Sequence, residues 1–166
     1  MNNLQSLDNE NYNNEYLYTL ISSDQIEIKD IPLEICHMSN VIKCIIDNCP
    51  DMKIDGEQQK IPISNVNGVT LEKIVDWLKY HHNNPPKKIE RPITTNDLST
   101  IVYEWDFNFI NIEIDEVINL MNASNYLDIK GLLDLCCAKM ASIIKGKSPA
   151  EIRQILRIEN DLEEKN

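Results

Sequence analysis

The stretch NYLDIKGLLDLCC, residues 125–137, decides how this chain is interpreted. It holds an apolar stripe that is broken by Asn125–Tyr126 and by Gly131, which fits a contact surface between two helices. Its adjacent thiols, Cys136 and Cys137, lie close to an aspartate and also fit metal or redox chemistry. The stretch is therefore either a protein-binding surface or a site of metal or redox chemistry, and the rest of the sequence is needed to distinguish these two interpretations.

Length and charge limit the class of protein. The 166 residues fit one domain with a core, or a small domain with a helical extension. The 27 acidic and 16 basic residues give a net charge of -11, which repels phosphate backbones and anionic lipids. Nucleic acid and membrane surfaces are thus poor candidate partners. The sequence shows no apolar segment long enough to span a membrane, and its start lacks the basic and hydrophobic regions of a signal peptide. We therefore expect the protein to stay in a reducing compartment.

The cysteine pattern favours structural thiols. An odd number of cysteines without a paired Cys-x-x-Cys motif argues against disulfides and against a standard zinc site. We expect Cys44 and either Cys136 or Cys137 to act as small apolar core residues. A metal or redox role stays open as a minor alternative; it would draw on Cys36, Cys44, Cys49, Cys136 and Cys137, with His37, His81 and His82 as further zinc ligands.

The first half of the chain predicts a small α/β unit. Residues 1–15 are rich in asparagine and indicate a disordered tail. Residues 16–21 and 26–28 predict a hairpin. The stretch QKIPISNVNG (59–68) predicts a short third strand, in which Pro62 favours an edge position. A short helical turn is expected to start at Pro32. Ser39 is the expected N-cap of a helix over 40–49, which Pro50 ends.

A longer helix and a loop follow. Asn67 or Thr70 is expected to cap a helix over 71–82, whose buried face is formed by Leu71, Ile74, Val75 and Leu78. Residues 83–104 carry three prolines and mixed charge, which predicts a surface loop. Three aromatic residues then anchor the end of this loop: Trp105, Phe107 and Phe109.

The last third is helical. Ile114, Val117, Ile118 and Met121 predict one face of a helix that ends near Tyr126. Asp128 is the expected cap of the next helix, which has Gly131 in its first turn, runs to Ile144 and stops at Gly146. The sequence SPAE then predicts a capping box, with the residues Ser148 as N-cap, Pro149 at the first helical position and Glu151 at the third.

Patterns of catalytic groups are weak. The four glycines are dispersed, so no phosphate-binding loop is predicted. Cys36–His37 and His81–His82 are sequence neighbours whose side chains diverge, and we interpret the stretches HMSN (37–40) and YHHN (80–83) as surface turns. Paired carboxylates occur in exposed acidic stretches, where nothing would raise one pKa above the other. The residues favour docking over chemistry.

A family resemblance covers residues 16–161. It rests on IPISNVNGVTLEKIVDWLKYHHNNPP (61–86), EWDFNF (104–109), NYLDIKGLLD (125–134) and IKGKSPAEIR (144–153), which follow one another in the same order as in the Skp family. Members of that family are adaptor subunits of SCF-type cullin-RING ubiquitin ligases. The resemblance implies an α/β fold: a BTB/POZ-like domain over 16–126, followed by an all-helical F-box-binding extension over 127–166.

The resemblance also implies two binding surfaces and no catalytic site, cofactor or metal. Asn125 and Tyr126 match the family's cullin-facing pair. The F-box-facing apolar positions fall on Val117, Ile118, Met121, Leu133, Cys137, Met140, Leu156 and Ile158. Implied partners are a cullin and F-box proteins, and indirectly a RING protein and a ubiquitin-conjugating enzyme. A homodimer without F-box protein, and a cytoplasmic and nuclear location, are further expectations.

The chain departs from the family pattern near its end. Family members usually show Thr-Phe-Asn where this chain has Ile155-Leu156-Arg157, and they continue into an acidic stretch and a helix that contains tryptophan. Here the sequence ends at LEEKN, which indicates a shortened tail. An adaptor paralogue that binds cullin but few F-box proteins is therefore the alternative function.

Overall fold

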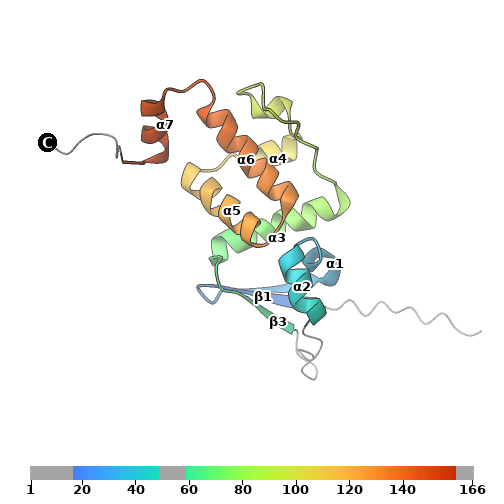
Figure 1. Ribbon diagram of the computed structural model, residues 1–166. Coiled ribbons are helices and arrows are strands. Elements are labelled where there is room, and N and C mark those ends of the chain that lie inside the picture. The colour runs from blue at the N-terminus through green and yellow to red at the C-terminus, as the bar shows by residue number, and fades with distance from the viewer. Residues whose placement is uncertain (1–16, 49–58, 160–166) are drawn as a thin grey trace, which may run out of the picture.

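The computed structural model describes residues 17–48 and 59–159 (Figure 1). The predicted hairpin is present as strands β1 (Leu17–Ser22) and β2 (Glu27–Pro32), which pair antiparallel. Strand β3 (Gln59–Ile63) pairs parallel with β1, so the described strands have the order β2-β1-β3. Pro62 thus lies on an edge strand as predicted. The predicted tail 1–15, Cys49 and Pro50 lie outside the described residues.

Two short helices follow β2. Helix α1 (Leu33–Cys36) begins directly after Pro32, and helix α2 (Asn40–Asn48) begins after Ser39. The N–H of Ile42 donates to Ser39 Oγ at 3.2 Å, which confirms Ser39 as the N-cap. Ile42 itself is fully buried. The cap and this apolar side chain together set the position of α2 over the sheet.

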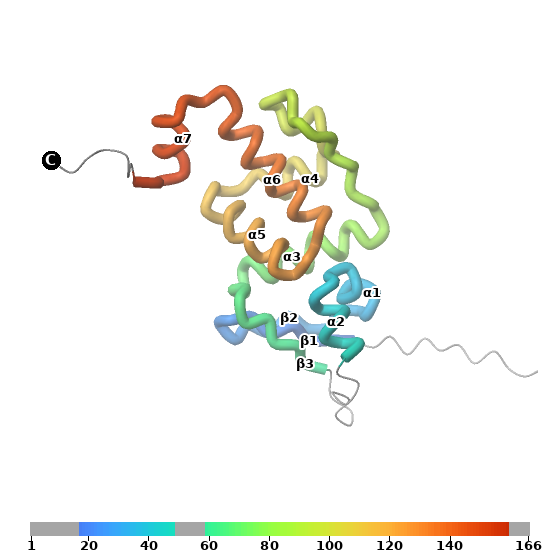
Figure 2. The backbone as a smooth tube through the Cα atoms, in the orientation of Figure 1, coloured from blue at the N-terminus to red at the C-terminus, as the bar shows by residue number. Residues whose placement is uncertain are grey.

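Helix α3 (Gly68–Asn83) crosses behind helices α5 (Ile114–Tyr126) and α6 (Lys130–Ile144) in the view of Figure 2. Asn67 Oδ1 accepts the N–H of Thr70 at 2.9 Å, which decides between the two predicted caps in favour of Asn67. Asp24 Oδ1 accepts the N–H of Gly68 at 2.7 Å and ties the hairpin to the start of the helix. The predicted core face is confirmed, because all four of its side chains are buried: Leu71, Ile74, Val75 and Leu78.

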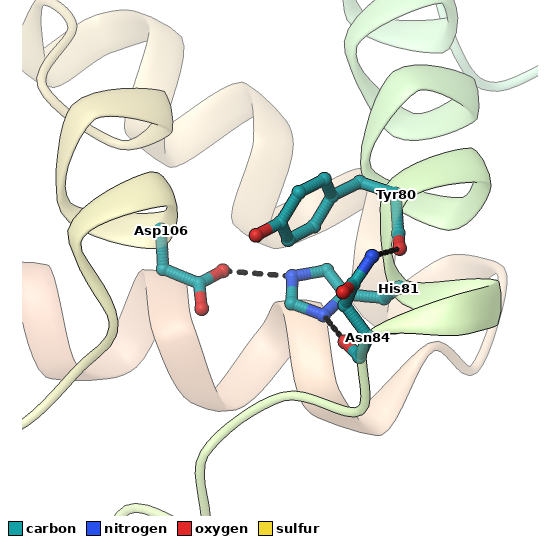
Figure 3. Close-up of polar contacts among 4 residues, drawn as sticks. All are labelled: Tyr80, His81, Asn84 and Asp106. Carbon is teal, nitrogen blue, oxygen red and sulfur yellow. Dashed lines mark hydrogen bonds and ion pairs between the residues drawn. The ribbon is translucent and has the colours of Figure 1, made fainter.

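The predicted surface turn at His81–His82 is wrong for His81, which is buried and whose ring points to Asp106 (Figure 3). His82 is exposed. His81 Nε2 lies 2.9 Å from Asp106 Oδ1 on helix α4 (Glu104–Phe109), and His81 Nδ1 lies 2.6 Å from the carbonyl oxygen of Asn84. Buried polar groups require such partners. The pair fastens α4 to the end of α3.

Aromatic stacking completes the junction of α3 and α4. The rings of Tyr80 and Trp105 are stacked with centroids 3.8 Å apart, and Trp105 stacks on Phe109 at 5.1 Å. Phe107 is half-buried against the core. These contacts confirm that the three aromatic residues anchor the end of segment 83–104. That segment also contains a short 3-10 helix, η2 (Leu98–Thr100), and both Leu98 and Val102 are buried in the core. The prediction of a surface loop is therefore wrong for this part of the segment.

Three helices form the last third of the described chain: α5 (Ile114–Tyr126), α6 (Lys130–Ile144) and α7 (Pro149–Leu156). Helices α5 and α6 pack against each other, and one buried cluster joins Leu132 and Leu135 of α6 to Leu20 of the sheet. Helix α6 approaches α3 closely, because a Cβ on Gly131 would lie 2.9 Å from the Trp77 ring. In residues 17–48 and 59–159, no helix has the length and apolar character needed to cross a membrane.

The turn between α5 and α6 corrects one prediction. Asp128 does not cap α6, whose N-cap is Ile129 without a side-chain bond. Asp128 has φ +50°, and its carboxylate accepts the side-chain amide of Asn40 at 2.8 Å. The tight turn requires this left-handed residue, which directs the carboxylate to α2 rather than to α6. The predicted end of α6 is confirmed, because Gly146 follows it with φ +73°.

Candidate protein-binding surfaces

The end of α5 is held in place from the α/β unit. Ser39 Oγ donates to the carbonyl oxygen of Leu127 at 2.6 Å in the buried interior, and the N–H of Val41 reaches the same oxygen at 3.5 Å. The bond between Asn40 and Asp128 adds a third link on the surface. These contacts fix the residues that immediately follow Tyr126, so the last turn of α5 is a rigid platform.

Tyr126 lies at a hollow of about 300 Å³ between α5 and the start of α3. Tyr126 is 39 % exposed, so part of its aromatic ring is accessible to a partner. The remaining lining is rich in amides and is formed by Asn65, Val66, Asn67, Thr70, Asn119, Asn122 and Ala123. An exposed aromatic ring beside hydrogen-bonding amides is a suitable anchor for a protein partner.

Asn125 and Tyr126, the predicted cullin-facing pair, are both exposed but point in different directions. Consecutive helical residues leave the axis about 100° apart. Tyr126 lines the hollow and Asn125 does not. By its spacing, Asn125 instead continues the line of Ile118 and Met121 along α5. Of the predicted pair, Tyr126 therefore belongs to the hollow and Asn125 does not.

Three asparagines of this hollow were not identified from the sequence: Asn65, Asn119 and Asn122. A signal for two of them exists, because Asn119, Asn122 and Tyr126 are spaced i, i+3, i+7 and share one face of α5. Asn65 belongs to the turn after β3, and nothing in the sequence relates it to α5.

The predicted F-box-facing residues lie on the three C-terminal helices of Figure 1. Six of them belong to α5 and α6, Leu156 is the last residue of α7, and Ile158 follows that helix. One of the eight is misassigned, since Val117 is fully buried and cannot contact a partner. The buried face of α5 is formed by Val117, Leu120, Ala123 and Ser124, so it is rotated from the predicted one. Seven positions are half-exposed or exposed: Ile118, Met121, Leu133, Cys137, Met140, Leu156 and Ile158.

Helix α7 is well formed but poorly covered. The capping box is confirmed: Ser148 Oγ accepts the N–H of Glu151 at 3.3 Å, and Glu151 Oε2 accepts the N–H of Ser148 at 2.7 Å. These bonds lower the pKa of Glu151. None of the residues of α7 is buried, although Ile152, Ile155 and Leu156 give it an apolar side. Ile158 is 57 % exposed.

An ion pair ties the end of α7 to the start of α5. Arg157 Nη1 lies 2.8 Å from Asp115 Oδ2, and both side chains are largely exposed. Arg157 has φ +53°, and the N–H of Ile158 donates back to the carbonyl of Arg153 at 2.9 Å. The residue that follows α7 is thereby tied to the first turn of α5.

The cysteines divide between core and surface. Cys36 and Cys136 are buried, and burial raises the pKa of each thiol to about 12, so both stay protonated at neutral pH. Cys137 is half-exposed. The expectation that Cys44 belongs to the core is wrong, because its side chain is exposed on α2. Among the described residues, no three His, Cys, Asp or Glu side chains group to hold a metal ion.

Together, the supported turn, the Tyr126 hollow and the uncovered side of α7 define a protein-docking module. Family models match two parts of the chain: the tetramerisation domain of the Skp1 family over residues 17–83, and the dimerisation domain of that family over 130–166.

Curated relatives agree with both matches. An S-phase kinase-associated protein 1 homolog from Tetrahymena thermophila is 42% identical over 136 residues, covering 81% of this chain and 78% of the relative. The E3 ubiquitin ligase complex SCF subunit sconC of Arthroderma otae is 39% identical over 143 residues, with 86% and 83% covered. A Skp1-related protein of Caenorhabditis elegans is 36% identical over 148 residues, with 85% and 80% covered. This chain belongs to the Skp1 family, and its POZ-type α/β unit with a helical C-terminal region is the predicted fold.

Proposed function

We propose that this chain is the adaptor subunit of an SCF-type ubiquitin ligase and joins a cullin to F-box substrate receptors. Family membership and the names of the relatives support this assignment. One structural observation carries it: α7 is a capped, amphipathic helix none of whose residues is buried. The apolar side of such a helix is left half-exposed within this chain, and a partner that covers it would complete its burial.

The two partners are assigned to separate surfaces. The cullin is assigned to Tyr126 and its hollow, because the turn behind them is rigidly held. Asn125, which continues the line of Ile118 and Met121, is assigned to the cullin at the border between the two surfaces. The F-box protein is assigned to the half-exposed apolar side chains of α5 and α6 and to Leu156 and Ile158 beyond them. Met121 and Met140 are flexible enough to accept different partner helices.

The adaptor holds other subunits and performs no reaction of its own. A RING protein and a ubiquitin-conjugating enzyme enter the complex through the cullin. We extend the proposal to a cytoplasmic and nuclear location, and to a homodimer that forms through the F-box surface when no F-box protein is present.

The test is reconstitution of a three-component complex. The full chain is mixed with a cullin amino-terminal domain and a full-length F-box protein, and the molar mass of the eluting species is measured by light scattering. We expect a 1:1:1 complex that does not form from cullin and F-box protein alone. Cullin and F-box protein that associate without this chain would contradict the bridging role.

A second candidate is a paralogue that binds cullin but few F-box proteins. It is favoured by one observation, that a half-exposed Leu156 stands where the family usually carries an aromatic anchor. Leu156→Phe distinguishes the two. If that substitution is needed before F-box proteins bind, the restricted paralogue is the better description.

A further inference from the structure

A groove of about 440 Å³ runs along the outer side of α6. One wall is a segment that we call the strap, residues 89–93, through Ile89, Arg91, Pro92 and Ile93. The other wall is formed by α6 and the residue after it, through Asp134, Cys137, Ala138, Ala141, Ile144 and Lys145. Most of these side chains are apolar, although the groove is open to solvent.

The strap is attached to α6 at two separate points. Arg91 pairs with Asp134 near the middle of the helix, and Lys145 Nζ donates to the carbonyl oxygen of Ile93 at 2.9 Å beyond its end. Asp134 and Lys145 are separated by roughly 16 Å along the helix axis. Ile89 and Ile93 also pack against the core. The groove is therefore a built feature with two fixed walls.

The groove continues the proposed F-box surface. Leu133, Cys137, Met140 and Ile144 are spaced i, i+4, i+7, i+11 and form one apolar stripe on α6. Cys137 and Ile144 of this stripe also line the groove. A partner that covers the stripe thus reaches the strap without leaving apolar surface.

The charges of the groove indicate what it accepts. Lys145 is bonded to a neutral carbonyl, and no carboxylate of the described residues lies within 4 Å of its amine. The parts of the chain outside the structure read MNNLQSLDNENYNNEY, CPDMKIDGEQ and NDLEEKN, and they offer few apolar side chains. These segments carry acidic residues but mostly isolated apolar side chains, so a partner with a longer apolar segment and an acidic residue complements the groove better.

We propose that the groove receives an apolar segment of the F-box subunit, with an acidic residue that pairs with Lys145. This inference rests on the proposed adaptor function and adds a second point of contact to it. The strap then acts as a wall of the receptor-binding surface rather than as a passive linker.

The experiment uses a full-length F-box protein that binds the wild-type chain. Ala141→Arg fills the groove with a charged side chain, and Asn96→Arg adds the same group at an exposed position outside it. We expect Ala141→Arg to weaken F-box binding by about tenfold or more, and the control to stay within about twofold. Cullin binding should be unchanged in both. In the wild-type chain, amide hydrogen exchange of residues 89–93 should slow when the F-box protein is added.

The outcomes separate the groove from the adaptor function. If Met140→Asp abolishes F-box binding while Ala141→Arg binds normally and the strap exchanges as before, the groove proposal is wrong and the function stands. If both variants bind normally, the assigned F-box surface fails as well. If Ala141→Arg instead removes self-association and leaves F-box binding intact, the occupant is a second copy of this chain and the proposal is overturned.

Discussion

The hydroxyl of Ser39 donates a 2.6 Å hydrogen bond to the carbonyl oxygen of Leu127, a residue 88 positions further along the chain. The same oxygen, Ser39 Oγ, accepts the N–H of Ile42 and caps α2. One buried side chain therefore starts a helix of the α/β unit and holds the turn that begins the helical extension. The position of Tyr126, one residue before Leu127, depends on it.

Ser39→Ala should loosen this turn. The variant loses a helix cap and leaves the buried Leu127 carbonyl with only a long contact to Val41, so we expect a loss of about 1–3 kcal/mol in the free energy of unfolding. Cullin affinity should fall while F-box affinity is retained. Urea unfolding and binding measurements check both. Ser142→Ala is the matched control, because the hydroxyl of Ser142 donates to the carbonyl oxygen of Lys139 within the same helix. Equal effects of the two changes would refute the special role of Ser39.

His81 and Asp106 form a buried pair that should be intolerant of losing one member. His81→Leu leaves the Asp106 carboxylate buried without its partner, and we expect it to cost about 3–5 kcal/mol in the free energy of unfolding. Replacing both by leucine should recover much of this loss, because a well-packed apolar pair can substitute for a buried ion pair.

The double-mutant cycle is measured by chemical denaturation. His82→Leu serves as the control, since His82 is the exposed neighbour on the same helix and should change stability by less than about 0.5 kcal/mol. A His81 variant no less stable than this control would show that the pair does not fasten α4 to α3.

The cap of α7 should respond to acid. Hydrogen bonds from Ser148 hold the pKa of Glu151 below its ordinary value of 4.5. A carboxylate whose pKa is lowered in the folded state stabilises that state, and the stabilisation is complete when the pH is above the ordinary pKa. It is lost as the pH falls through the lowered pKa of the folded state. Amide resonances of Ser148 and Glu151, followed by NMR from pH 6 to pH 3, should therefore shift as the box opens. Glu151→Gln should remove the titration; an unchanged pH response in that variant would mean another group is responsible.

Local patterns in the sequence predicted most of the elements. The hairpin, the core face of α3 and the capping box of α7 depend on residues within a few positions of one another, so periodicity and capping rules are sufficient for them. The end of α5 at Tyr126 and the stop at Gly146 were predicted for the same reason.

Features that depend on distant partners were not predictable in this way. His81 can be buried because its ring bonds to Asp106, which lies 25 residues later in the chain. Nothing in the sequence around either residue predicts that the two pair. Asp128 points to α2 because the turn requires a left-handed residue there. The buried side of α5 is rotated toward Leu120 and Ala123 because α3 and α6 both pack against this helix. The seven accessible F-box positions came from the family resemblance, and their contacts stay predictions.

Isothermal titration of Tyr126→Lys against a cullin amino-terminal domain and against an F-box protein tests the central claim most directly, because the claim is that the two partners use separate surfaces. Asn83→Lys is the control: it adds the same charge, and Asn83 is an exposed residue at the far end of α3. We predict that Tyr126→Lys lowers cullin affinity by about 100-fold or more, as expected for a central aromatic anchor, and leaves F-box affinity within about twofold. Normal cullin binding by this variant, or equal loss of both partners, would contradict the account.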